Sequence, residues 1–177
     1  MGLDSVELIL AWEESFGITI SDAEAATMFT TRLVTESVYA KIRSDQPEDQ
    51  GCLSLRAFFR LRKAFAEEGI SRQEVRPDAK VADFVPRPRR REILGAVSER
   101  AGLGPLKRVP FALQFTFGRV RDMVSDAVIG KHEMLRLPGH GWSQAQVREV
   151  VRAVLFTQQA LRGFSDDDKF VEDLGIN

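Results

Sequence analysis

The sequence predicts an all-α protein. Apolar residues recur at helical spacing through most of the chain, and glycine, proline or short polar clusters separate these periodic segments. The one alternating segment, residues 17–21, is too short to predict a strand. The chain has 177 residues, of which 44% are hydrophobic. These values are typical of one ordinary globular domain or of two small ones.

The N-terminal 44 residues are expected to form three helices. The first runs from about Ser5 to Phe16, a short one begins near Asp22, and the third covers residues 31–42. Gly17 can end the first helix, because glycine adopts the left-handed backbone of a C-cap without steric cost. The inward stripe of this first helix is expected to consist of Val6, Ile9, Leu10, Glu13 and Phe16, widened by Leu8 and Trp12.

Two segments that contain glycine and proline are expected to be linkers, residues 44–51 and 130–141. The rest of the chain is again periodic at helical spacing. Helices are expected over residues 54–68, 89–101, 118–128 and 143–161.

Three parts of the chain match three others at nearly constant separations. Residues 6–18 match 91–103 at a separation of 85, residues 30–38 match 116–124 at 86, and residues 54–85 match 143–174 at 89. The middle of the chain therefore contains one complete unit, whereas the two ends contain the same unit cut and exchanged. This order predicts a circular permutation with a second copy inserted. The expected domains are residues 1–44 with 142–177, and residues 52–131.

Charge is segregated along the chain, although the total is only −1. Residues 1–50 sum to −7, residues 51–141 to +8 and residues 142–177 to −2. The split domain is thus acidic and the inserted domain basic. This asymmetry predicts that the basic domain docks on the acidic one within the chain or recruits a partner, through Arg89, Arg90 and Arg91.

The segment from Gly2 to Ala25 resembles the acyl carrier proteins. In that family a Gly-x-Asp-Ser-Leu/Val motif opens the second helix, and its serine carries 4′-phosphopantetheine. The motif matches Gly2, Asp4, Ser5 and Val6 of this sequence. The C-terminal FVEDLG, residues 170–175, resembles the family segment that directly precedes the motif. The resemblance implies two small four-helix bundles, one of them split between the chain ends.

The same resemblance implies a carrier without catalytic activity of its own. It would hold an acyl or aminoacyl group as a thioester on phosphopantetheine at Ser5, beside Asp4 and Leu3, in fatty acid or polyketide biosynthesis. Its implied partners are a phosphopantetheinyl transferase and acyl-transferring or condensing enzymes. The residues expected to bind partners are Val6, Glu7, Glu13 and Glu14, together with Arg89, Arg90 and Arg91.

The physical chemistry of a helix start supports Ser5 independently. A phosphodiester there would meet free backbone N–H groups and the positive end of the helix dipole. Asp4 and Glu7 also have the spacing of a capping box. In the inserted copy the positions of Asp4 and Ser5 are taken by Arg89 and Arg90, so that copy cannot carry the group.

Two alternatives remain open at this point. The pair of copies could be an unmodified scaffold or regulatory module without a prosthetic group, and the C-terminal helix could exchange with a second molecule. The chain has neither a metal-ligand spacing nor an apolar stretch long enough to span a bilayer, and its single cysteine excludes an internal disulfide. The Pro/Arg stretch of residues 86–91 has few aromatic neighbours, so nucleic-acid binding is not expected. A cytoplasmic location is expected.

Overall fold

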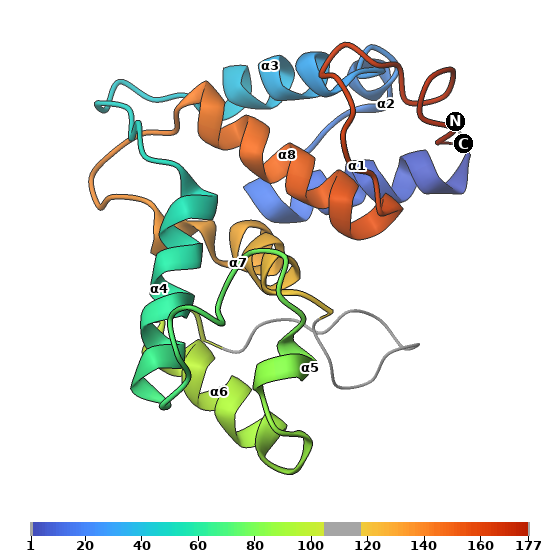
Figure 1. Cartoon of the computed structure of the whole chain (residues 1–177). Helices are drawn as coiled ribbons and strands as arrows, with labels where there is room; N and C mark the ends of the chain where they lie inside the picture. Colours follow the sequence, from blue (N-terminus) through green and yellow to red (C-terminus); the bar gives the residue numbers. More distant parts are fainter. Residues whose placement is uncertain (1, 105–117, 177) are drawn as a thin grey trace. The chain divides into compact units, whose positions relative to one another are not determined.

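The computed structural model describes residues 2–104 and 118–176 (Figure 1). Within these ranges the regular structure is helical, and β-type pairing is confined to isolated bridges between single residues, which confirms the all-α prediction. The helices are α1 (Leu3–Phe16), α2 (Asp22–Ala25), α3 (Thr31–Ile42), α4 (Leu53–Glu67), α5 (Val81–Phe84), the 3₁₀ helix η1 (Arg87–Arg89), α6 (Arg90–Arg100), α7 (Val120–Leu135) and α8 (Gln144–Gln159).

The chain divides into two compact units. Unit 1 comprises Met1–Cys52 and Arg136–Asn177, and unit 2 comprises Leu53–Leu135. Unit 1 therefore contains α1, α2, α3 and α8, which come from opposite ends of the sequence. The first turn of α1 and the segment that follows α8 lie side by side where the two chain ends meet (Figure 1).

In unit 1, α8 packs against both α3 and α1. The inner face of α8 is rich in valine, and Val147, Val150 and Val151 are each 0% exposed. Val34 and Val38 of α3 are equally buried against it. Ser143 caps α8, because its side chain accepts a hydrogen bond from the backbone N–H of Gln146.

The predicted inward stripe of α1 is wrong at Val6 and Leu10, which are 45% and 57% exposed. It is confirmed at Leu8 and Trp12, which are each 1% exposed. This helix carries apolar residues on more than one side, so its periodicity alone could not select the buried side. The choice depends on the other end of the chain, because the ring of Phe170 lies 5.9 Å from that of Trp12.

In unit 2, α4 packs against α7 and α6. Leu61 and Phe65 of α4 are 0% exposed, as are Val97 of α6 and Met123 of α7. The Phe65 ring makes an edge-to-face contact with Phe84 of α5, with 5.4 Å between the centroids. Unit 2 thus has a core of its own.

Helix α7 is longer than the sequence predicted. It continues through a bend at Lys131, whose φ and ψ are −139° and 19°, and ends at Leu135. The extra turn packs within unit 2, because Leu135 is 1% exposed and its carbonyl accepts a hydrogen bond from Arg56 Nη1 at 3.0 Å. The expected linker at residues 130–141 therefore begins only at residue 136.

The segments that join the units lie side by side within unit 1. Asp49 N–H donates to the carbonyl of Gly141 at 3.0 Å, and Gly141 N–H donates to the carbonyl of Pro47 at 2.9 Å. The Asp49 side chain, 1% exposed, also accepts a hydrogen bond from Leu137 N–H at 2.8 Å. These contacts tie the end of the first segment of unit 1 to the start of the second.

The same backbone hydrogen bonds recur in both units, 89 residues apart. Arg32 N–H donates to the carbonyl of Asp166 in unit 1, and Arg121 N–H donates to that of Pro77 in unit 2, both at 2.9 Å. Antiparallel bridges join Thr30 to Lys169 and Lys80 to Arg119. In each unit, then, the start of one helix is held against the loop that follows the long helix.

This spacing corrects one of the three sequence matches. Residues 30–38 were matched at a separation of 86, whereas the hydrogen bonds pair α3 with α7 at 89. The difference of three residues is close to one helical turn, so both alignments superimpose similar apolar patterns. Residues 116 and 117 of the expected match lie outside the described residues.

The match of α1 with α6 has the separation of 85 that the sequence indicated. A glycine in the left-handed region follows each helix, Gly17 directly after α1 with φ 63° and Gly102 two residues after the end of α6 with φ 66°. The next residue closes the same hydrogen bond in each case, Ile18 N–H to the carbonyl of Glu13 and Leu103 N–H to that of Ser98. The two helices therefore share this hydrogen bond after the glycine, although the C-cap residue is Gly17 in α1 and Ala101 in α6.

Candidate functional site

Helix α1 begins two residues earlier than the sequence predicted. Gly2 is the N-cap, with extended backbone angles, and its carbonyl accepts a hydrogen bond from Val6 N–H at 3.3 Å. Ser5 is therefore the third residue of the helix. The capping box expected from Asp4 and Glu7 is wrong, since Asp4 is already helical and an N-cap residue must be extended.

Ser5 nevertheless lies in the first turn of α1, and its neighbours are open to solvent. Leu3 is 81% exposed, Asp4 and Glu7 are exposed, and Ser5 itself is half-buried. The first N–H groups of a helix have no acceptor one turn earlier, and the helix dipole favours an anion beside them. A phosphodiester on the Ser5 hydroxyl fits this position.

The acidic residues of α1 differ in their surroundings. Glu7 and Glu14 are exposed. Glu13 is half-buried, and its Oε1 accepts a hydrogen bond from Ile20 N–H at 2.6 Å. This bond gives Glu13 a structural role, because it holds the loop after α1 against the helix.

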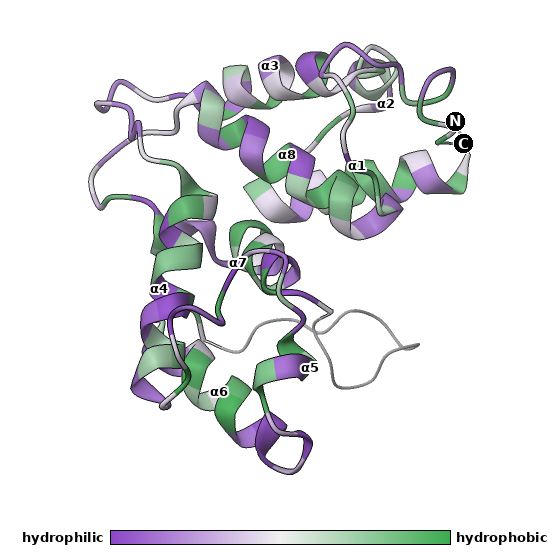
Figure 2. Ribbon diagram, viewed as in Figure 1, coloured by the Kyte–Doolittle hydropathy of each residue, from purple (hydrophilic) through white to green (hydrophobic). Residues whose placement is uncertain are grey.

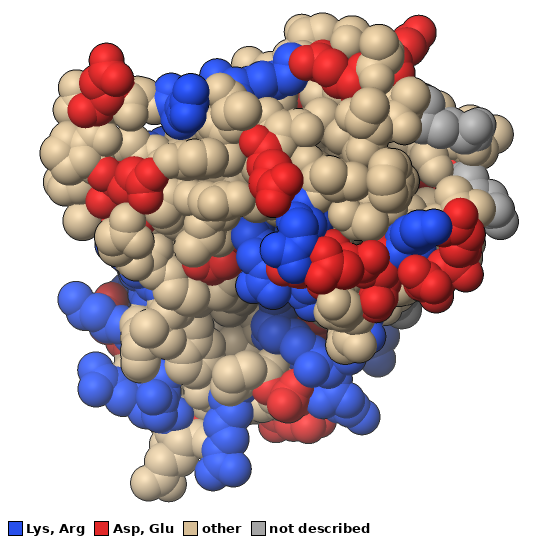
Figure 3. Space-filling model, turned by 90° about the horizontal axis from the view of Figure 1, so that it is seen from above, with Lys and Arg blue, Asp and Glu red and all other residues tan. Residues whose placement is uncertain are grey.

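A second acidic residue, Glu24, caps the start of the short helix α2 that follows this loop. Glu24 pairs with Lys41 of α3 at 2.5 Å and completes a capping box with Ser21. The hydrogen bond from Lys41 and those from Ser21 lower the pKa of Glu24 to about 2. Figure 3 shows neighbouring charges of opposite sign on the face that it displays.

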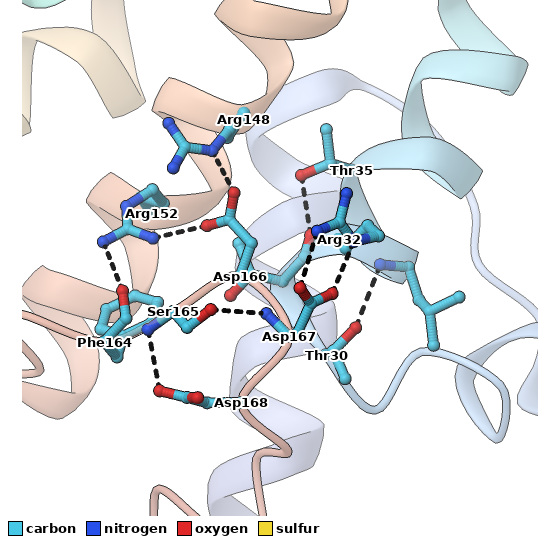
Figure 4. A network of polar contacts seen from close by, with 12 residues as sticks. Thr30, Arg32, Thr35, Arg148, Arg152, Phe164, Ser165, Asp166, Asp167 and Asp168 are labelled. Carbon is cyan, nitrogen blue, oxygen red and sulfur yellow. Dashed lines mark hydrogen bonds and ion pairs between the residues drawn. The ribbon is translucent and has the colours of Figure 1, made fainter.

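A network of charged side chains fixes the segment that leads to the C-terminus (Figure 4). Asp166 accepts hydrogen bonds from Arg148 and Arg152 of α8, the second at 2.5 Å. Arg152 also donates to the carbonyl of Phe164 and lies 4.1 Å from the centroid of its ring. Burial raises the pKa of Asp166, but the bonds from the two arginines outweigh it and lower that pKa below its usual range.

A second ion pair ties the same segment to α3. Arg32 contacts Asp167 through two hydrogen bonds, of 2.5 and 2.7 Å, which lower the pKa of Asp167 and raise that of Arg32. Unit 2 repeats this pair 89 residues away, where Arg121 lies 2.5 Å from Asp78. No role for these residues was predicted from the sequence, although the match of residues 54–85 with 143–174 aligns Asp78 with Asp167.

The end of the C-terminal segment enters the core beside α1. Phe170 is 7% exposed and Ile176 is 2% exposed. Phe170 N–H donates to the carbonyl of Phe29, directly before α3, at 3.0 Å. The FVEDLG sequence and the helix that contains Ser5 are therefore parts of one packed unit.

Comparisons with protein-family models, curated proteins and solved structures find no match. The case for a function consequently depends on the residues themselves. In residues 2–104 and 118–176, no group of three or more His, Cys, Asp and Glu side chains could hold a metal ion. No helix of this described part is long and apolar enough to cross a membrane.

The predicted basic residues lie at the start of α6 in unit 2. Arg89 pairs with Glu92 at 3.0 Å, and this bond raises the pKa of Arg89. Arg90 donates to the carbonyl of Val85 at 3.1 Å, whereas Arg91 is exposed. Arg90 lies 85 residues after Ser5, so the first turn of α6 carries cations where that of α1 carries Asp4 and Ser5.

Proposed function

We propose that unit 1 is a cytoplasmic carrier of acyl or aminoacyl groups, with 4′-phosphopantetheine attached to Ser5. The observation that carries this proposal is the contact of Phe170 with Trp12, 5.9 Å between ring centroids. It joins the two carrier-like motifs, which lie at opposite ends of the sequence, within one core. Without this contact, the resemblance would consist of two separate fragments.

The residues of the first turn of α1 have distinct parts in this proposal. The Ser5 hydroxyl is the attachment point, and the N–H groups of the turn face the phosphodiester. The exposed side chains of Leu3, Asp4 and Val6 are the surface that a phosphopantetheinyl transferase would contact. When attached, the group supplies the thiol that holds the acyl chain as a thioester.

The exposed acids favour partners with basic surfaces. Glu7 and Glu14 add negative charge beside the attachment point. Unit 1 as a whole carries 8 Lys and Arg against 16 Asp and Glu, a net charge of −8. Such a field speeds the encounter with a positively charged enzyme.

The repeated contacts support a relationship between the two units. In our proposal unit 2 is a second carrier-type bundle inserted between the halves of a circularly permuted first one. The Arg–Asp pairs and backbone hydrogen bonds that recur at 89 residues are the reason. Arg90 has no hydroxyl to modify, so unit 2 would not carry a prosthetic group.

Intact mass spectrometry tests the proposal. The protein is incubated with coenzyme A and a phosphopantetheinyl transferase of broad specificity. We expect a mass gain of one phosphopantetheine in the wild type and none in Ser5→Ala. The matched control is Thr19→Ala, which removes an exposed hydroxyl of the same unit and should leave the mass gain unchanged.

Circular dichroism of each sample establishes that it is folded. A folded wild type that gains no mass would overturn the carrier proposal and leave the unmodified interaction module. A gain that persists in Ser5→Ala would move the attachment point to another residue.

A further inference from the structure

Each unit exposes one apolar stripe on a helix. On α1, Leu3, Val6 and Leu10 are 81%, 45% and 57% exposed. On α4, Leu55 and Phe59 are each 53% exposed. Their spacings, of three, four and seven residues, put each set on one helical face. Figure 2 shows hydrophobic and hydrophilic residues interleaved along both helices.

The matching helix of the other unit lacks these stripes. The positions 89 residues after Leu55 and Phe59 are Gln144 and Arg148, and Arg148 is bound to Asp166. At these two positions α8 therefore has polar residues, which solvent or an ion pair satisfies, whereas α4 has half-exposed apolar side chains.

A similar contrast holds between α1 and α6, and here the apolar stripe is in unit 1. The positions 85 residues after Leu3, Val6 and Leu10 are Pro88, Arg91 and Gly95, all of them exposed. Exposed apolar stripes of this kind mark interaction surfaces, because water contact with them is unfavourable. The hydrogen bonds that recur in both units form whether or not these apolar residues are present, so the stripes are not required for those contacts.

The charges beside the two stripes have opposite signs. Asp4, Glu7 and Glu14 are exposed on α1. On α4 the neighbours are Arg60 and Lys63. The side chain of Lys63 is 73% exposed and lies 4.0 Å from Glu67 of the same helix. Unit 2 carries 17 Lys and Arg against 10 Asp and Glu, a net charge of +7, which opposes the −8 of unit 1.

We propose that the stripe of α4 binds the stripe of α1 from a second copy of this chain. Leu55 and Phe59 are the apolar anchors on one side, and Leu3, Val6 and Leu10 are those on the other. Lys63 and Arg60 face the acids of α1. Each copy gives one α1 and one α4, so a symmetric dimer would contain two such contacts.

The contact uses the surface that the proposed carrier offers to its enzymes. Self-association therefore competes with modification of Ser5 and with partner binding. The dimer itself does not depend on the prosthetic group, so it is tested on unmodified protein. Its failure and the failure of the carrier proposal are separate results.

Sedimentation velocity measures the association over a range of about 10 μM to 1 mM, where small interfaces become occupied. We expect a wild-type dimer whose dissociation constant rises with salt, because the charge pairs are screened. Phe59→Ala removes an apolar anchor and should weaken the dimer about tenfold.

Charge exchange provides the sharper test. Lys63→Glu and Glu7→Lys should each weaken self-association about tenfold, because each creates like-charge contacts. An equimolar mixture of the two variants should dimerise as the wild type does, since both contacts of the mixed dimer are again complementary. The matched control is Arg87→Glu, an exposed charge reversal in unit 2 outside α4, which should have little effect.

Circular dichroism establishes that each variant is folded. A wild type that stays monomeric at the highest concentration overturns the proposal, whether its stripes bind each other within one chain or bind other molecules. A dimer that Phe59→Ala and both charge variants leave unchanged also overturns it, because the interface then lies elsewhere.

Discussion

In both units the loop after the long helix is held against the start of a second helix, α3 in unit 1 and α7 in unit 2. The units differ at the start of a third helix, α1 in unit 1 and α6 in unit 2. In both, an arginine one residue inside a helix pairs with an aspartate of the loop, Arg32 with Asp167 and Arg121 with Asp78. The first turn of α1 then contains Asp4 and Ser5, whereas α6 begins with a run of arginines. The contacts that the two units share therefore form with either an acidic or a basic residue at the start of this third helix.

The two units share the contacts that fold them, but they differ in the residues on their surfaces. The recurring contacts are mainly backbone hydrogen bonds and buried apolar side chains, and the hydrogen bonds recur 89 residues apart at α3 and α7 and 85 residues apart at α1 and α6. Leu3, Asp4 and Val6 are exposed, and so are the different residues at the equivalent positions, Pro88, Arg89 and Arg91. A unit can therefore lose an attachment serine and gain a basic surface while its core stays the same.

The largest expected effect comes from the core contact that completes unit 1. Trp12→Ala removes a side chain that is 1% exposed and should lower the free energy of unfolding of unit 1 by about 3–5 kcal/mol. Denaturant titration and amide hydrogen exchange would show earlier unfolding of unit 1 than of unit 2.

Leu10→Ala is the matched control on the same helix. Its side chain is 57% exposed, so the change should be about 0.5 kcal/mol or less. Equal losses in the two variants would contradict the assignment of the buried face of α1.

A smaller effect is expected at the loop network of unit 1, where Asp166 has no acidic counterpart in unit 2. The position 89 residues earlier is Pro77. Asp166→Asn removes the charge that Arg148 and Arg152 contact, at an expected cost of about 1–3 kcal/mol to unit 1 at neutral pH.

The lowered pKa of Asp166 gives this effect a pH dependence. Because the pKa is lower in the folded state than the value of about 3.9 in unfolded chains, its stabilisation is present above that value. It is lost as the pH falls toward the folded pKa. Wild type and Asp166→Asn should therefore converge in stability in acid, as measured by denaturant titration. A difference that stays constant with pH would contradict this role.

The smallest effects are expected from the repeated ion pairs. The side chains of Arg32 and Asp167 are 56% and 64% exposed, so Arg32→Ala should cost about 1 kcal/mol or less. Arg121→Ala should cost unit 2 a similar amount. If one variant unfolds its unit and the other has no effect, the two pairs are not equivalent.

The helices themselves were largely predictable from the sequence. Residues 31–42 and the start of α8 at Ser143 follow from clear apolar periodicity and a capping serine. The end of α7 was not predictable, since Lys131 interrupts the helical backbone and the last turn depends on the contact of Leu135 with Arg56. Long-range contacts of this kind leave no local pattern.

The candidate site was predictable in part for the same reason. The motif around Ser5 is local and can be read in the sequence, but the predicted start of its helix was two residues too late. The buried side of α1 and the network around Asp166 depend on residues more than 150 and about 15 positions away, respectively. Local periodicity cannot supply such contacts.

The central claim is that the two ends of the chain together form one unit, whose helices pack with the same contacts as those of unit 2. A permuted chain, in which residues 136–177 precede residues 1–135 through a short Gly/Ser linker, tests it most directly. We expect its two-dimensional amide NMR spectrum to match that of the wild type except near the new and lost junctions. Loss or general displacement of the unit 1 signals, with those of unit 2 retained, would contradict the claim.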